Sequence, residues 1–148
     1  MKALLTILAL LLVGCEDQAI ELNTGSRELP AEVEEACDIL GVECRAGNSR
    51  QSIRVNLVPM DAEMEGGIEG ITHPSKGCRR EISVKPIPKA IAHEIAHAHN
   101  LRHVENPADL SDIEGPLMCP NCYGEQLTYE EWEDLQNAAN SWATNCPG

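Results

Sequence analysis

HEIAHAHNLRH, residues 93–103, holds four of the five histidines of the 148-residue chain. Pro88 can open a helix at its first position, and the apolar spacing predicts a helix from there to about Leu101. Each helical residue advances by about 100°, so His93 and His97 project from one face, one turn apart. The opposite face is apolar and predicts packing against a core through Ile91, Ile95 and Ala98.

This arrangement suits a catalytic zinc ion. Two neutral imidazoles one turn apart match tetrahedral zinc, and the adjacent carboxylate of Glu94 can act as general base on a zinc-bound water. A catalytic zinc usually has three protein ligands and one position open to water. We expect His103 to be the third ligand, which requires a sharp turn of the chain near residue 100. The alternative, a set of satisfied surface histidines, leaves their clustering unexplained.

The other two histidines are expected to have different roles. On a helix, His99 falls about 240° from His93 and points away from both predicted ligands, so we expect a packing or surface residue. His73 lies on or just after a predicted strand. We expect it to be structural or to lie at the edge of a cleft.

The rest of the chain predicts an α+β domain. Pro30 opens a helix that stops at Gly41, and this helix presents Val33, Cys37 and Leu40 on one face. Residues 53–57 alternate apolar and polar side chains, which predicts a half-buried strand. Residues 68–72 and 82–84 predict two more short strands.

The last helix begins with a strong capping pattern. Thr128 and Glu131 form a predicted capping box, and Leu127 and Trp132 have the spacing of a hydrophobic staple. The helix then continues an inward face with Leu135, Ala139 and Trp142.

The N-terminus has the features of an export signal. Lys2 precedes an apolar run that is too short to span a bilayer, which needs roughly 20 residues. The run ends in Leu12-Val13-Gly14-Cys15, which resembles the lipobox of bacterial lipoproteins, where the chain is cut before a cysteine that becomes lipidated. We expect residues 1–14 to be removed and Cys15 to anchor the exported protein to a bacterial membrane, at the periplasmic face or the cell surface. The alternative is an ordinary cleaved signal with a chance cysteine.

The net charge of −13 argues against a nucleic-acid partner, because such proteins need a basic surface. Residues 15–29 are acidic and lack periodicity, so we expect the lipidated cysteine and a tether there. A folded domain is expected over residues 30–148.

Six cysteines remain besides the lipidation candidate: Cys37, Cys44, Cys78, Cys119, Cys122 and Cys146. An even count in a small exported chain predicts up to three disulfides, but the sequence does not choose among their pairings. Cys119 and Cys122 alternatively have the spacing of a metal site, although no second such pair exists to complete it.

Residues 93–103 resemble the extended HExxHxxGxxH motif of the metzincin metallopeptidases. Leu117-Met118-Cys119-Pro120 resembles the Met-turn that this family, and its matrixin branch in particular, has beneath the metal. The helix from Thr128 also looks like the matrixin C-terminal helix. The resemblance covers about residues 50–143.

The resemblance implies a small twisted mixed β-sheet with an active-site helix, an N-terminal helix and a C-terminal helix. It implies a zinc endopeptidase domain over 30–148, a monomer, in which His93, His97 and His103 hold one zinc ion. Met118 would lie beneath the metal without ligating it. A peptide substrate would lie extended along the edge strand near Ile68–Thr72.

Three departures from the family pattern remain. Asn100 replaces the usual glycine, a change that is tolerated because Asn adopts the left-handed conformation more readily than other residues. Val104 matches none of the subfamily markers. The acidic residues at 105–114 form no convincing calcium loop, so a calcium site is left undecided.

Two other functional classes compete with the peptidase. One is a non-catalytic, zinc-stabilised binding lipoprotein, which would share the anchor, the disulfides and the metal. A structural zinc has no use for a general base and usually has four protein ligands, so Glu94 discriminates between the two. The other is a purely structural disulfide-rich surface protein, which leaves the histidine cluster unexplained.

Overall fold

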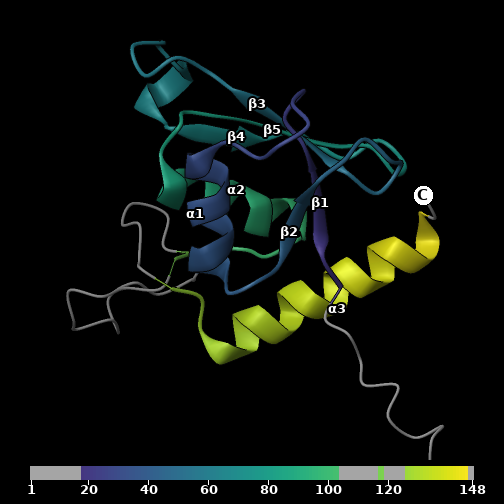
Figure 1. The fold of residues 1–148 in the computed structure, drawn as a ribbon. Coiled ribbons are helices and arrows are strands. Elements are labelled where there is room, and N and C mark those ends of the chain that lie inside the picture. Colours follow the sequence, from purple (N-terminus) through teal and green to yellow (C-terminus); the bar gives the residue numbers. More distant parts are fainter. Residues whose placement is uncertain (1–17, 104–116, 119–125, 147–148) are drawn as a thin grey trace, which may run out of the picture.

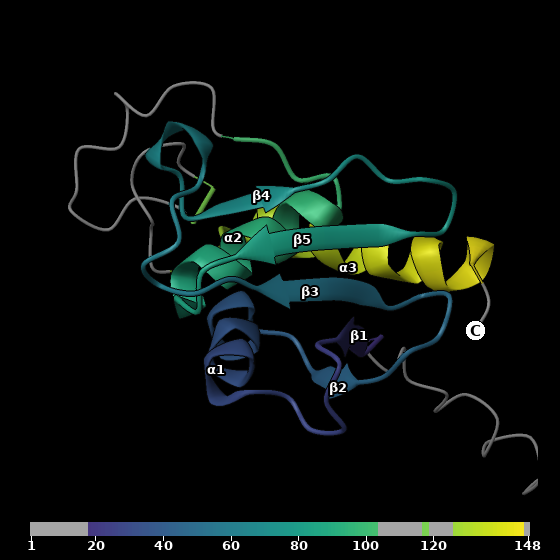
Figure 2. The same ribbon diagram turned by 90° about the horizontal axis from the view of Figure 1, so that it is seen from above.

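A five-stranded mixed sheet forms the frame of the fold (Figures 1 and 2). The computed structural model describes residues 18–103, 117–118 and 126–146. The strands are β1 (Ile20–Asn23), β2 (Cys44–Ala46), β3 (Ile53–Leu57), β4 (Gly70–Thr72) and β5 (Arg80–Val84). Their order is β2-β1-β3-β5-β4, and all neighbouring pairs are parallel except β4 with β5. β4 is therefore an edge strand.

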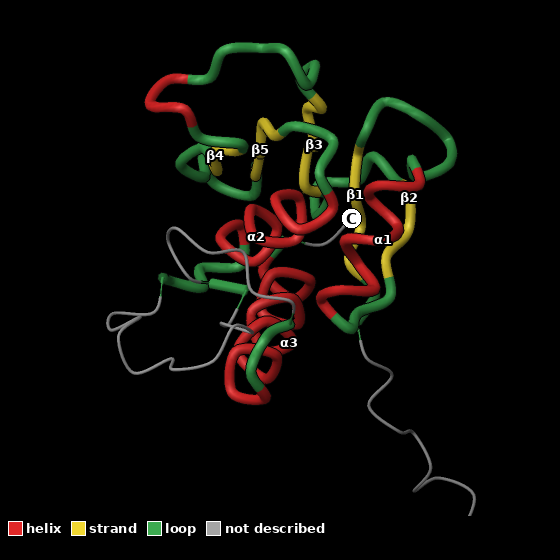
Figure 3. The backbone as a smooth tube through the Cα atoms, turned by 90° about the vertical axis from the view of Figure 1, so that its left-hand side faces the viewer, coloured by secondary structure: helices red, strands yellow, loops and turns green. Residues whose placement is uncertain are grey.

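Three α-helices cover one face of this sheet: α1 (Ala31–Leu40), α2 (Pro88–Ala98) and α3 (Tyr129–Asn145). A short 3₁₀ helix, η1 (Glu65–Gly67), precedes β4. Figure 3 shows α2 between the sheet and α3, with α1 beside α2. The predicted α+β class, with a mixed sheet and helices near the N-terminus, at the histidine motif and near the C-terminus, is confirmed.

The core forms where the sheet meets the helices. β3 and β5 direct every second side chain into the core, with Ile53, Ile82 and Val84 each 0% exposed and Leu57 partly buried. From the helices, Ile91 and Ile95 of α2 reach the same core. The predicted inward face of α1 is confirmed, since Val33, Cys37 and Leu40 are buried. On α3, Leu135 and Ala139 are buried as predicted, whereas Trp142 is only partly buried.

The N-terminal prediction was wrong for part of the expected tether. Residues 15–29 were expected to be a flexible connection, but Ile20–Asn23 form β1, which lies between β2 and β3. The side chains of Ile20 and Leu22 are buried in the core, at 3% and 0% exposure. The prediction gave weight to the surrounding acidic residues and overlooked the alternation of these two apolar positions. Strand β2 was also not predicted.

The ends of the helices follow the sequence closely. Gly41 caps α1 with a φ of 66°, a left-handed conformation that glycine adopts without steric cost. The capping box of Thr128 and Glu131 is formed at the start of α3. Helix α2 ends at Ala98, somewhat earlier than expected.

Two disulfides join elements of the described chain. Cys37–Cys44 links α1 to β2, and Cys78–Cys146 links the β4–β5 loop to the end of α3. These bonds confirm four of the six disulfide candidates and indicate an exported protein. Cys119, Cys122 and the lipidation candidate Cys15 lie outside the described residues, as do residues 105–114. Within the described ranges, no helix combines the length and apolar character needed to cross a bilayer.

Candidate metal centre

Helix α2 has both of its predicted ligands on the side that faces the edge of the sheet. Pro88 occupies the start of the helix, where its lack of an N–H costs nothing. His93 is 5% exposed and Glu94 is 7% exposed, whereas His97 is half-buried. The helix therefore presents two imidazoles and a carboxylate at the boundary between core and solvent.

The chain reverses direction after α2 through a left-handed residue. Asn100 has a φ of 65° and is the one non-glycine residue with positive φ in the described part of the chain. The Asn100 N–H donates to the His97 carbonyl at 2.9 Å, and the Leu101 N–H donates to the Ala96 carbonyl at 3.1 Å. This pair of bonds is a Schellman motif. The predicted turn near residue 100 is thus confirmed, and it brings His103 back beside α2.

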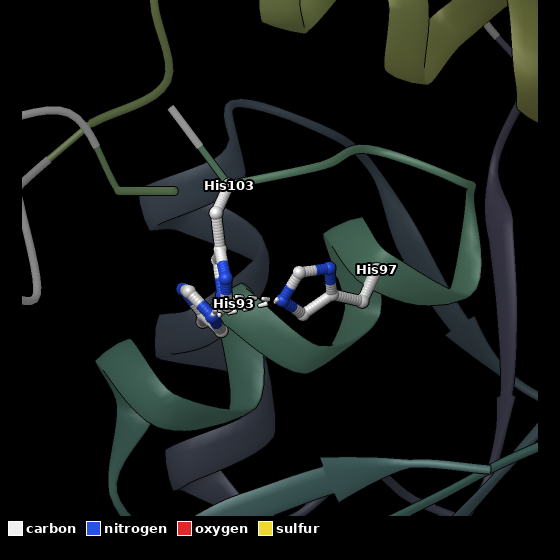
Figure 4. A group of neighbouring side chains, drawn as sticks. All are labelled: His93, His97 and His103. Atoms are coloured by element: carbon white, nitrogen blue, oxygen red, sulfur yellow. Dashed lines mark hydrogen bonds between the residues drawn. The ribbon is translucent and has the colours of Figure 1, made fainter. Parts of the chain in front are cut away.

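The three predicted histidine ligands converge on one point (Figure 4). The Nε2 atom of His93 lies 3.0 Å from Nε2 of His97 and 3.0 Å from Nε2 of His103. The Nε2 atoms of His97 and His103 are 2.9 Å apart. Among the described residues, this is the one group of three or more His, Cys, Asp or Glu side chains close enough to hold a metal ion.

The opposite ring nitrogens fix the protonation of two of these imidazoles. Nδ1 of His93 lies 2.8 Å from the Leu117 carbonyl, and Nδ1 of His97 lies 2.8 Å from the Leu101 carbonyl. A carbonyl only accepts, so both Nδ1 atoms are protonated and both Nε2 atoms present lone pairs. Lone pairs facing each other at 3.0 Å repel unless they share a cation. The donor set fits zinc, which binds imidazole nitrogen at about 2.0–2.1 Å and favours ligands oriented in this way.

Burial favours the neutral form of His93 and His103. Burial, together with the neighbouring His97 and His103, lowers the pKa of His93 to about 4, against the opposing hydrogen bond with the Leu117 carbonyl. Burial and His97 also lower the pKa of His103. Near neutral pH the Nε2 atoms of His93 and His103 therefore carry no competing proton that metal binding would have to displace.

Strand β4 holds the carboxylate of Glu94. The hydroxyl of Thr72 lies 2.6 Å from Oε2 of Glu94 and 3.0 Å from the Glu94 backbone carbonyl. Burial raises the pKa of Glu94, while the hydrogen bond from Thr72 acts in the opposite direction. The carboxylate therefore has a fixed orientation in a partly desolvated position beside the histidines.

Close contact between β4 and α2 depends on a glycine. A Cβ atom added at Gly70 would lie 2.7 Å from Cγ of Glu94 and 2.9 Å from a methyl carbon of Val84. Both distances are shorter than ordinary van der Waals contact. Gly70 thus permits the approach that lets Thr72, two residues later on the same face, reach Glu94.

An open cleft of about 700 Å³ lies between β4 and α2. Its lining includes the three histidines, Glu94, and residues Ile68–Ser75 except Glu69. Ile68 and Ile71 are each 42% exposed there, which is high for large apolar side chains. The cleft therefore combines an apolar strand edge with the convergent histidines, a combination typical of ligand sites.

The other predicted residues also have defined positions. Met118 is fully buried, and the carbonyl of the preceding Leu117 meets His93. His73 lines the cleft and shares a hydrogen bond with Ser83, as expected of a residue at the cleft edge. His99 is 3% exposed and contacts the Ile95 carbonyl through Nδ1, so it is the expected packing residue and lies outside the cluster.

Thr72 and Gly70 were not predicted as parts of the site. The available signal was the period of two within the segment Gly-Ile-Thr, which places both residues on the same face of the strand. That face could not be assigned to α2 from the sequence, because the register of β4 against β5 was unknown.

Comparisons with known proteins add a distant structural likeness. No family model and no curated protein matches this sequence. Metalloproteinase-II from Bacteroides fragilis is similar in structure, with 12% sequence identity and a TM-score of 0.49. The alignment covers 83% of this chain and 54% of that one, so the chain spans about half the length of that protein. The candidate metal centre stands on its own geometry.

Proposed function

We propose that this protein is a zinc-dependent endopeptidase of metzincin type. The observation that carries the proposal is the convergence of three Nε2 atoms within 3.0 Å of one another, with Glu94 next to them in an open cleft. His93, His97 and His103 hold the metal. Met118, buried beside the His93 contact, lies beneath it and is not a ligand.

The residues of the chain then divide the chemistry among them. When bound, zinc lowers the pKa of a water molecule towards about 7 and polarises a substrate carbonyl. Glu94 accepts the proton that the attacking water loses and later delivers it to the leaving amine. Thr72 holds the Glu94 carboxylate at Oε2 while this proton moves.

The free edge of β4 supports a peptide substrate. An extended chain can add to such an edge through backbone hydrogen bonds and be fixed across the cleft. β4 is the last strand of the sheet, and its residues line the cleft beside the histidines. This arrangement favours internal cleavage of unstructured polypeptides.

A single pair of variants tests the proposal. The protein should contain about one zinc ion per chain and cleave peptides in a mixed library, as read by mass spectrometry, with activity lost to a chelator and restored by zinc. Glu94→Gln should retain the metal, because Glu94 is not a ligand, but lose about 10²–10⁴-fold in turnover. His103→Ala should lose metal and activity together.

The same measurements address the competing class. If Glu94→Gln cleaves as well as wild type, the activity belongs to a contaminant and the proposal fails. Zinc binding by the wild type without cleavage of any library peptide would favour the non-catalytic binding lipoprotein.

We also propose that Cys15 attaches the protein to a bacterial membrane. The support is the lipobox-like sequence before Cys15 together with the disulfides expected of an exported chain. Stable anchoring requires two or more acyl chains. Native protein should fractionate with membranes and Cys15→Ser should be released or unprocessed, whereas an unmodified Cys15 in soluble wild-type protein would contradict the anchor.

A further inference from the structure

A pocket of about 290 Å³ at one end of the sheet gathers a large share of the positive charge. We call it the basic pocket, and its lining includes Arg50, Arg54, Lys76, Arg79 and Arg80. These are five of the eleven Lys and Arg residues in a chain with a net charge of −13. All its other lining residues are neutral, and none is Asp or Glu.

Two carboxylates lie close to the basic pocket, Glu21 beside its lining residue Ser49 and Glu81 opposite Arg54 in the sheet, and each accepts a hydrogen bond from a neighbouring residue. Glu21 pairs with Arg45 at 3.3 Å and accepts the Ser49 N–H at 2.7 Å. Glu81 accepts a hydrogen bond from the Asn56 side chain at 2.6 Å. Within the described residues, no ion pair involves a cation of the basic pocket.

The basic pocket adjoins one end of the metal cleft. Arg80 lines both. His73 and Pro74 line the cleft and also a second hollow, whose other lining residues are Lys76, Arg79 and Glu81. Figure 2 shows why: β4 runs towards the same end of the sheet at which β3 and β5 begin. A chain that lies along β4 and continues past Thr72 therefore meets the basic pocket.

The spacing of the charges identifies the ligand class. Four of the cations are exposed, and they come from the segment before β3, from β3 itself and from the β4–β5 loop. Such a spread suits several carboxylates in sequence better than one compact anion. Because the rest of the protein is strongly acidic, an acidic ligand is attracted here and repelled elsewhere.

We propose that the basic pocket binds an acidic stretch of the polypeptide substrate, on one side of the scissile bond. This inference rests on the proposed peptidase function. It assigns the enzyme a preference for substrates with Asp and Glu residues that leave the cleft at the β4–β5 loop.

Three matched peptides test the preference: one neutral, one with four Glu residues N-terminal to the cleaved bond, and one with the same residues C-terminal to it. At an ionic strength of about 10 mM, where screening is weak, one acidic peptide should exceed the neutral one about 10-fold in kcat/KM. This figure assumes three exposed charge pairs that each contribute about twofold. The other acidic peptide should gain nothing, because the pocket lies at one end of the cleft.

Removing the positive charges should lower the ratio of kcat/KM between the favoured acidic peptide and the neutral peptide. Arg79→Gln should reduce it about twofold, and the triple variant Arg50→Gln, Lys76→Gln, Arg79→Gln should bring it close to one. Arg27→Gln is the matched control, since it removes an equally exposed arginine outside the pocket and should retain the wild-type ratio. An equal loss in Arg27→Gln, or equal gains for both acidic peptides, would overturn the proposal by showing a general charge effect.

A binding measurement separates this proposal from the peptidase itself. Fluorescence anisotropy of a labelled Glu-rich peptide should show binding to the wild type and to Glu94→Gln, and weakened binding to the triple variant. That result would stand even if no peptide were cleaved. Absence of binding to the wild type would overturn the proposal. A competition experiment provides a second test, in which the labelled peptide is displaced either by excess unlabelled Glu-rich peptide or by phosphatidylglycerol vesicles. Displacement by the vesicles alone would indicate a membrane-binding surface and would also overturn the proposal.

Discussion

The two walls of the cleft contribute in different ways to the candidate site. Helix α2 and its turn supply all three histidines, whose Nε2 atoms meet within 3.0 Å. Strand β4 supplies no metal ligand. Instead Thr72 bonds to the Glu94 carboxylate and Gly70 lets the strand approach it. One wall supplies the three imidazoles of the candidate metal centre, and the other holds the neighbouring carboxylate.

A further contrast lies within α2 and its cap. His93 and His99 are both buried, each has Nδ1 near a backbone carbonyl, and burial lowers the pKa of each to about 4. Only His93 faces other imidazoles. Direction on the helix, and not burial or protonation, therefore distinguishes a candidate ligand from a packing residue.

The largest effect is expected for loss of a histidine from the helix wall of the cleft, that is, from α2 and its turn. His97→Ala removes a ligand, and zinc affinity should fall by more than about 100-fold, because loss of a residue that merely orients a ligand already costs about 10–100-fold. Competition with a zinc chelator dye measures this change. Peptide cleavage should disappear in parallel.

His99→Ala is the matched control for that variant. It loses a buried hydrogen bond and should lower the free energy of unfolding by about 1–3 kcal/mol, measured in urea. It should nevertheless bind one zinc ion with wild-type affinity. Loss of zinc in His99→Ala but not in His97→Ala would contradict the assignment of the two faces.

A smaller effect is expected at the strand wall. Thr72→Val keeps the shape of the side chain but removes its hydrogen bond to the Glu94 carboxylate. A hydrogen bond to a charged group contributes about 1.5–3 kcal/mol, so kcat should fall by at least about 10-fold. Zinc content and KM should change little, because Thr72 positions the base and binds no metal.

Thr72→Ser distinguishes positioning from packing, because it restores the hydroxyl but not the methyl group. It should recover most of the lost kcat. If Thr72→Val and Thr72→Ser were equally impaired, the methyl group and not the hydrogen bond would be the important contact.

The helix wall could be predicted from sequence because its information is local. The spacing of His93 and His97 fixes their common face, and Asn100 marks where the helix ends. The capping box at Thr128 and the apolar faces of α1 and α3 are local in the same sense. Each of these features depends on residues within about one or two turns of one another.

A strand over residues 68–72 was predicted, and β4 lies within it, but its contacts with α2 could not be predicted because they depend on long-range information. The contact between Thr72 and Glu94 joins residues 22 positions apart and depends on the register of β4 with β5. The same limitation applies to β1, which forms only through pairing with β2 and β3, two strands that follow it in the sequence. The Cys78–Cys146 pairing, 68 residues apart, was equally open.

The smallest effect is expected at Asn100, in the turn where helix α2 ends. Asn100 has a φ of 65° and an exposed side chain, so its replacement tests backbone conformation with little loss of packing. Asn100→Gly should bind zinc as the wild type does, since glycine adopts this conformation freely. Asn100→Val should bind about 10-fold more weakly by chelator competition, because the left-handed conformation costs an ordinary residue about 1–2 kcal/mol and a β-branched residue at least that. Equal zinc affinities in the two variants would show that His103 reaches the other histidines without help from the turn.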